Sequence, residues 1–145
     1  MINIYILKNI KINNIKKFKK FIKKIVYFEN KNIYIINYIF CSNKYILHLN
    51  RKYLKKKYYT DTITFNYNFK NKIFGDIFIS VDQIYYNSIY WNIKYSIEIK
   101  RVIIHSLLHL LGYNDNNIIN KNNMVKKENY YLKLSNNIKF KYEKI

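Results

Sequence analysis

The sequence predicts an α+β domain in which one mixed β-sheet of about four strands packs against about five helices. Two observations predict this class. Stretches of β-branched and aromatic residues alternate with amphipathic helical patterns, and one helix near residue 105 is apolar on almost every side, as a helix in the centre of a core is. The length of 145 residues fits one domain spanning residues 1–145, and half of the residues are hydrophobic, which is enough to form a core.

The first part of the chain predicts the order strand, helix, strand, helix. Residues 1–7 form a short apolar strand in this prediction. Residues 12–28 carry apolar side chains at helical spacing with lysines between them, which indicates an amphipathic helix with a basic outer face. Residues 32–40 are β-branched and aromatic and predict a buried strand, and residues 43–54 predict a second helix.

Two strands follow in the middle of the chain. Residues 60–67 alternate polar and apolar side chains, which is the period of a strand with one face buried. Residues 74–80 predict another strand. Ser80 and Gln83 have the spacing of a capping box, so we expect a helix to begin there.

Two helices complete the predicted order β-α-β-α-β-β-α-α-α. Residues 96–111 form the central apolar helix, and Gly112 is placed to end it, because glycine is favoured just after the last helical turn. Residues 122–134 predict the last helix.

The strong positive charge of the chain is only a weak indication of function. The formal net charge is +19, which favours polyanions such as nucleic acid. However, Ile, Lys, Asn, Tyr and Phe supply more than two thirds of the residues, and their codons begin with two A or T bases, so a strongly A+T-biased genome also explains the lysines. The single cysteine, Cys41, has no disulfide partner, and no apolar stretch is long enough to cross a membrane, so we expect a cytoplasmic protein.

A pair of histidines stands out in the central helix. Between residues 102 and 111 only His105, Ser106 and His109 are not aliphatic. Four residues separate the histidines, so both lie on one face of the helix, one turn apart. Two buried imidazoles need polar partners, and one divalent metal satisfies both. The alternative is a pair of core histidines that bind backbone carbonyls.

The residues that follow favour a metal. Gly112 lets the chain turn back, so Asp115 can supply a third ligand beside the two histidines. Two nitrogens, one carboxylate and an open position are typical of catalytic zinc. The position after the first histidine is Ser106, where a zinc peptidase would carry its glutamate base, which argues against that class.

Five motifs occur in a fixed order over roughly residues 33–134. They are LNRKYL at 49–54, TDTITF at 60–65, GDI at 75–77, HSLLHLLGYND at 105–115, and Met124 with Glu128. In this order they resemble the YbeY endoribonucleases, also called rRNA maturation factors, whose histidine signature is close to H-G-x-L-H-L-x-G-Y-D-H. An aspartate in the last position is similar to a Bacteroidetes-type branch of that family.

The resemblance implies a site and an activity. The family's metal ligands fall on His105, His109 and Asp115, which would hold one Zn²⁺ and act in catalysis through a metal-bound water. Ser106 replaces the usual glycine, and its hydroxyl can bond back to the helix. The implied activity is a single-strand-specific, metal-dependent endoribonuclease in 16S rRNA 3′-end maturation and late ribosome quality control. The general base stays open, with Asp76 and Glu128 as weak candidates.

The resemblance also implies ribosomal RNA, or the small ribosomal subunit, as the partner. The arginine frequent in the family falls on Leu54, so we expect Arg51, Lys55, Lys56 and Lys57 to bind RNA instead, although a solvated loop is the alternative reading of this run. Two other functions stay open: a non-cleaving ribosome-assembly factor with a structural metal, and another zinc hydrolase.

Overall fold

A computed structural model describes residues 1–143 except residue 9 and residues 55–59. The predicted RNA-binding residues Lys55, Lys56 and Lys57 therefore lie outside the described residues. Within the described part, the chain forms the predicted α+β arrangement of one mixed four-stranded sheet and five α-helices, so the predicted fold class is confirmed.

The main sheet has the strand order β1-β3-β5-β4. Strands β1 (Ile2–Ile6), β3 (Asn32–Cys41) and β5 (Lys72–Ser80) run parallel to one another, and β4 (Thr62–Asn66) pairs antiparallel with β5. Strand β4 therefore forms one edge of the sheet, and it is this edge that borders the candidate site.

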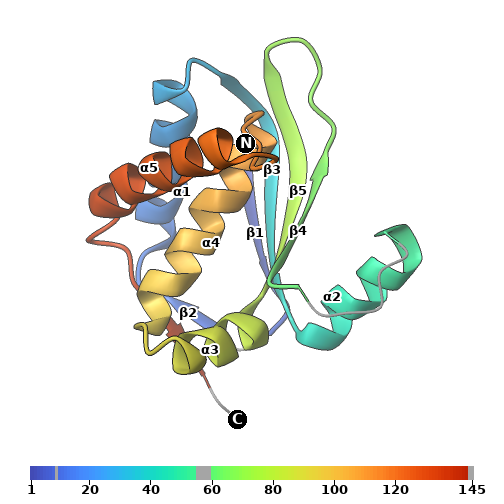
Figure 1. The fold of residues 1–145 in the computed structure, drawn as a ribbon, viewed down its shortest axis with the longest axis vertical. Coiled ribbons are helices and arrows are strands. Elements are labelled where there is room, and N and C mark those ends of the chain that lie inside the picture. Colours follow the sequence, from blue (N-terminus) through green and yellow to red (C-terminus); the bar gives the residue numbers. More distant parts are fainter. Residues whose placement is uncertain (9, 55–59, 144–145) are drawn as a thin grey trace.

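Helices cover both faces of the sheet unequally. The helices are α1 (Ile15–Phe28), α2 (Asn43–Leu49), continued by a π-helical turn (Asn50–Leu54), α3 (Val81–Tyr90), α4 (Tyr95–Leu110) and α5 (Ile118–Leu134). Figure 1 shows α1, α4 and α5 together on one side of the sheet, while α2 extends away on the other side. No helix in the described ranges combines the length and apolarity needed to cross a bilayer.

Strand β3 divides the core into two clusters because its side chains alternate between the faces of the sheet. Ile36, Tyr38 and Phe40 are fully buried in the large cluster under α1 and α4. Ile39 and Cys41 face the other way, into a smaller cluster with residues of α2. The sheet is therefore buried on both sides at this strand.

Helix α4 lies at the centre of the large cluster, as its all-round apolar pattern predicts. From Ile99 to Leu110 every side chain is buried except those of Arg101, His105 and His109. These three are spaced four residues apart and form one strip along the helix. The only face of this segment that reaches solvent therefore carries its polar chemistry.

Three local features differ from the predictions. A second, two-stranded sheet pairs β2 (Ile10–Ile12) with β6 (Phe140–Tyr142), and strands of three residues are too short to show a period in the sequence. Helix α5 begins at Ile118 rather than at residue 122, because the Asn117 side chain caps it by accepting a bond from Asn120 N.

The third difference is at the start of α3. Ser80 caps the helix as expected, accepting a bond from Gln83 N at 3.2 Å. The Gln83 side chain bonds forward to Asn87 instead of back to the cap, so only half of the predicted capping box forms.

Candidate metal centre

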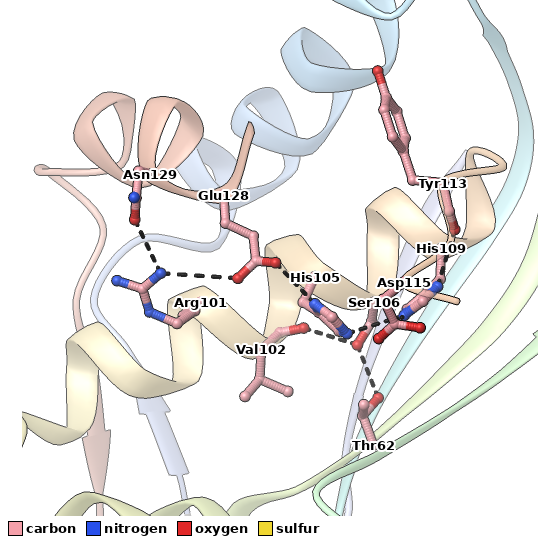
Figure 2. A network of polar contacts seen from close by, with 10 residues as sticks. All are labelled: Thr62, Arg101, Val102, His105, Ser106, His109, Tyr113, Asp115, Glu128 and Asn129. Carbon is pink, nitrogen blue, oxygen red and sulfur yellow. Dashed lines mark hydrogen bonds and ion pairs between the residues drawn. The ribbon is translucent and has the colours of Figure 1, made fainter. Parts of the chain in front are cut away.

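The three predicted metal ligands meet at one point. His105 Nε2 and His109 Nε2 lie 3.0 Å apart, and Asp115 Oδ2 is 3.9 Å from His109 Nε2. One ligand atom from each residue falls within 4.8 Å of the other two. Figure 2 shows the two rings rising from α4 with the Asp115 carboxylate beside them.

The outer nitrogen of each ring has its own partner. Glu128 Oε2 lies 2.9 Å from His105 Nδ1, and the backbone oxygen of Tyr113 lies 3.0 Å from His109 Nδ1. A carbonyl oxygen can only accept, so His109 Nδ1 must donate to it. In the same way, His105 Nδ1 donates to the Glu128 carboxylate. With both Nδ1 atoms engaged, the two Nε2 atoms are directed at each other and at Asp115 (Figure 2).

This geometry fits a divalent metal. Two Nε2 lone pairs 3.0 Å apart repel each other unless a proton or a cation lies between them. Ligand atoms bound to tetrahedral zinc at about 2.0–2.1 Å are about 3.3 Å apart, a value that lies between the two distances observed here. His105, His109 and Asp115 are therefore a suitable set to hold such an ion.

A tight turn brings Asp115 back to the helix. Gly112 has φ of +107°, a backbone conformation that side chains disfavour, and Tyr113 N bonds to Leu108 O at 3.0 Å. Asn114 Oδ1 then accepts bonds from Asn116 N and Asn120 Nδ2. Gly112 thus ends the helix as predicted, and the turn positions the third ligand.

Glu128, from the next helix, orients His105. Its side chain is only 8% exposed, and its second oxygen lies 3.8 Å from the Arg101 guanidinium, which also donates to Asn129 (Figure 2). The hydrogen bond that His105 Nδ1 donates to the Glu128 carboxylate raises the pKa of His105. Glu128 is therefore already engaged with His105 and Arg101, which makes it a positioning group rather than a free base.

The ligands open into a cleft of about 540 Å³ between α4, α5 and the edge strand β4. Its walls carry Asp61, Thr62, Thr64, Asn66, Glu98, Arg101, Val102, His105, His109 and Glu128. The polar residues of β4 face α4, as the alternating pattern of that strand predicts. An elongated substrate can therefore reach the metal ligands from solvent.

Asp61 is a cleft residue that the sequence did not single out. It precedes β4, and burial raises its pKa, an effect that the positive charge of His105 and the backbone amides of Asp61 and Thr62 oppose. Its place in the TDTITF motif was the only available signal. A half-buried carboxyl group with a raised pKa beside a metal site is suited to proton transfer.

Ser106 connects the metal helix to the edge strand. Its hydroxyl donates back to Val102 O at 2.8 Å, as expected, and lies 2.9 Å from Thr62 Oγ1. Thr62 Oγ1 in turn lies 2.9 Å from Phe78 O. The two hydroxyl protons are shared among these three contacts, and because Ser106 is fully buried, its close contact with Thr62 fixes the distance between the two walls of the cleft.

Two other candidate residues lie elsewhere. Asp76 bonds to Asn37 and Tyr67 on the face of the sheet opposite α4, so it cannot serve as the base. Arg51 is exposed in the π-helical turn after α2 and is not among the residues that line the cleft.

Comparison with known proteins identifies the family. The family model described as Endoribonuclease YbeY matches residues 4–136. The chain belongs to the YbeY family. The resemblance predicted from the sequence motifs is thus confirmed, and family membership supports an endoribonuclease role.

Relatives and a solved structure agree with this assignment. The chain is 46% identical to endoribonuclease YbeY of Karelsulcia muelleri over 132 residues, covering 91% of this chain and 94% of that protein. It is 45% identical to endoribonuclease YbeY of Bacteroides fragilis, over 77% of this chain and 81% of that protein. The solution structure of TM1509 from Thermotoga maritima superposes with a TM-score of 0.68 at 25% identity, covering 92% and 87% of the two chains.

Proposed function

We propose that this YbeY-family chain is a zinc-dependent endoribonuclease that cuts single-stranded RNA, and that it acts in the cytoplasm on the 3′ end of 16S rRNA during maturation and late quality control of the small ribosomal subunit. The observation that carries the proposal is the convergence of two Nε2 atoms and one carboxylate oxygen inside an open cleft. A family role in RNA cleavage supplies the substrate class.

The chain's own residues divide the work. His105, His109 and Asp115 would hold one Zn²⁺, which when bound polarises a phosphoryl oxygen and acidifies a water. Glu128 and the Tyr113 carbonyl hold the two rings in the required orientation. Arg101 lies at the cleft wall, where its guanidinium can bind a phosphate.

Asp115 changes the charge of the site relative to a three-histidine set. A carboxylate ligand adds a negative charge to the metal, so a bound water is expected to be less acidic than with three neutral imidazoles. Proton removal by a protein carboxylate is then more useful, and Asp61 is the group that we assign to this role.

The test combines metal content with RNA cleavage for the wild type, His109→Ala and the exposed His48→Ala as a control. We expect zinc and cleavage in the wild type and in His48→Ala, and loss of both in His109→Ala with an unchanged circular dichroism spectrum. Wild-type protein prepared without chelator that carries no zinc would overturn the metal site. Zinc without cleavage of unstructured RNA would favour a non-cleaving assembly factor.

We also propose that Arg51, Lys55, Lys56 and Lys57 bind RNA phosphates, whereas the lysines of residues 16–24 on α1 mostly reflect codon bias. Neutralising the first group should make the slope of log affinity for RNA against log salt concentration less steep. The slope should fall by about one for each lysine or arginine that contacts a phosphate. Equal losses for the two groups would contradict this division.

A further inference from the structure

The charge around the metal ligands raises the question of how RNA is held. Among the described residues that line the cleft, Arg101 is the one permanent cation, against the acidic Asp61, Glu98 and Glu128. Asp115 adds a fourth carboxyl group at the site. With the two charges of one bound Zn²⁺ added, the positive charges still do not outnumber these four carboxyl groups, so a polyanion needs attractive contacts beyond the cleft itself.

A second cavity of about 650 Å³ lies across α5 from the cleft, between the C-terminal end of α1 and α5. Four aromatic side chains and two lysines line it: Phe28, Tyr113, Tyr130, Tyr131, Lys126 and Lys127. Phe28 is 44% exposed and Tyr130 is 54% exposed, so ring surface is open to a ligand. Flat rings beside cations are the combination that binds unpaired nucleotides, because bases stack on rings and lysines meet phosphates.

The carboxylate in this cavity is already neutralised. Glu29 accepts hydrogen bonds from the hydroxyl groups of Tyr113 and Tyr131 and an ion pair from Lys127 at 3.0 Å. These contacts fix the inner rings and remove the repulsion that a free carboxylate would exert on a phosphate. Lys126 is exposed at the rim.

Tyr113 joins the two cavities. Its backbone oxygen accepts from His109 Nδ1, and its ring points away from the metal ligands (Figure 2). The hydroxyl group of that ring donates to Glu29. Helix α5 is shared as well, because Glu128 faces the cleft and the neighbouring Lys127 faces the second cavity. A strand cut at the metal ligands thus has a second contact surface on the adjoining side of α5.

We propose that this α1–α5 cavity binds one unpaired nucleotide of the RNA, flanking the site of cleavage, with its base on the Tyr130 and Phe28 rings and its phosphate at Lys126. The proposal rests on the proposed function for its substrate class. The occupant is an RNA nucleotide rather than a peptide, because Lys126 leaves the described lining of the cavity with a net positive charge and the chain belongs to an endoribonuclease family.

The test is steady-state cleavage of an unstructured RNA and of a series of the same RNA in which one nucleotide lacks its base. The position of the abasic nucleotide differs from one RNA of the series to the next. Tyr130→Ala should raise KM about fivefold or more with little change in kcat, since one stacked base contributes on that order. One abasic position should weaken the wild type similarly and have no further effect on Tyr130→Ala. Tyr86→Ala and Lys16→Gln, which alter exposed residues elsewhere, serve as controls, and Lys126→Gln should raise KM more than Lys16→Gln.

A second readout does not need cleavage. Photo-crosslinking of RNA that carries 4-thiouridine should label Phe28 or Tyr130, the two rings assigned to the base, in the wild type. Normal cleavage with no change of KM in Tyr130→Ala and no crosslink at Phe28 or Tyr130 would overturn the cavity while leaving the proposed function intact. If the wild type does not cut RNA, the proposed function fails, and the crosslink still decides whether the cavity binds RNA.

Discussion

Glu128 is a single side chain on which metal affinity should depend. It is buried, and it holds His105 by Nδ1 at 2.9 Å. Glu128→Gln keeps the shape but removes the charge that stabilises the ring, so we expect metal affinity to fall about 10- to 100-fold. Competition with a coloured chelator measures the metal affinity. An unchanged thermal midpoint of the metal-free variant would show that the loss of affinity does not come from unfolding. Unaltered affinity would show that Glu128 does not orient the ligand.

Asp61 should act on the chemical step. Asp61→Asn should lower kcat about 10²- to 10⁴-fold while the zinc content stays unchanged. Burial raises the pKa of Asp61, and a base works only when ionised, so wild-type activity should decline as the pH falls through that raised pKa. The acidic limb of the rate profile should be missing in Asp61→Asn. Retention of the limb would assign proton transfer to another group.

The metal ligands were predictable from the sequence, whereas the roles of the supporting residues were not: Glu128 was a candidate base and Asp61 was not singled out. The four-residue spacing of His105 and His109 inside an apolar helix made these two ligands recognisable. Asp115 was recognisable because it follows a glycine that ends the helix. Glu128 and Asp61 come from other elements, which only the packing of α5 and β4 against α4 brings to the site. Their roles depend on tertiary distances that have no local pattern.

Between elements, Gly75 determines how closely the metal helix approaches the sheet. A Cβ atom at Gly75 would lie 2.6 Å from Leu110 Cδ1 and 2.6 Å from Phe65 O. Gly75→Ala should therefore destabilise the fold by about 1–3 kcal/mol, through overpacking between α4 and β5. Urea unfolding measures the change.

Gly112→Ala is the matched control for that variant. Apart from its two chain neighbours, no described residue has an atom within 4 Å of the added methyl group, so its cost should come from the φ of +107° alone, about 1 kcal/mol or more. Because Gly112 directs the chain toward Asp115, this variant should also weaken metal binding. A Gly75→Ala variant as stable as the wild type would show that α4 can shift without cost.

Across the whole molecule, Glu29 joins α1, the turn after α4, and α5. Burial alone would raise the pKa of Glu29, but hydrogen bonds from Tyr113, Tyr131 and Lys127 outweigh it and lower that pKa below its ordinary value of 4.5. A lowered pKa stabilises the fold at any pH above the ordinary value, and this stability is lost as the pH falls through the folded-state pKa.

Glu29→Gln should therefore cost about 1–3 kcal/mol at neutral pH, and the difference from the wild type should narrow in acid. Thermal unfolding at several pH values measures this, with Glu143→Gln, at a surface ion pair with Lys11, as the control. A stability difference between the wild type and Glu29→Gln that is the same at all pH values would mean that the charge of Glu29 does not stabilise the fold.

At the scale of the whole molecule, the class and order of most elements were predicted, whereas the strand order of the main sheet and the second sheet were not. Long periodic segments such as α1 and α4 show their class in the sequence, and the edge strand β4 shows its alternation. The two-stranded sheet escaped prediction because its strands are three residues long and gain their stability from contacts such as the packing of Phe140 on Phe18, with ring centroids 5.6 Å apart.

That small sheet also bears on the order of events during synthesis. Asn13 Oδ1 accepts a bond from Lys139 N, 126 residues along the chain, beside the pairing of β2 with β6. A growing chain can assemble β1, α1 and β3 early, but Phe18 keeps an uncovered side until Phe140 has emerged. Until Phe140 emerges, the nascent protein thus exposes part of its aromatic core, and exposed apolar surface favours aggregation.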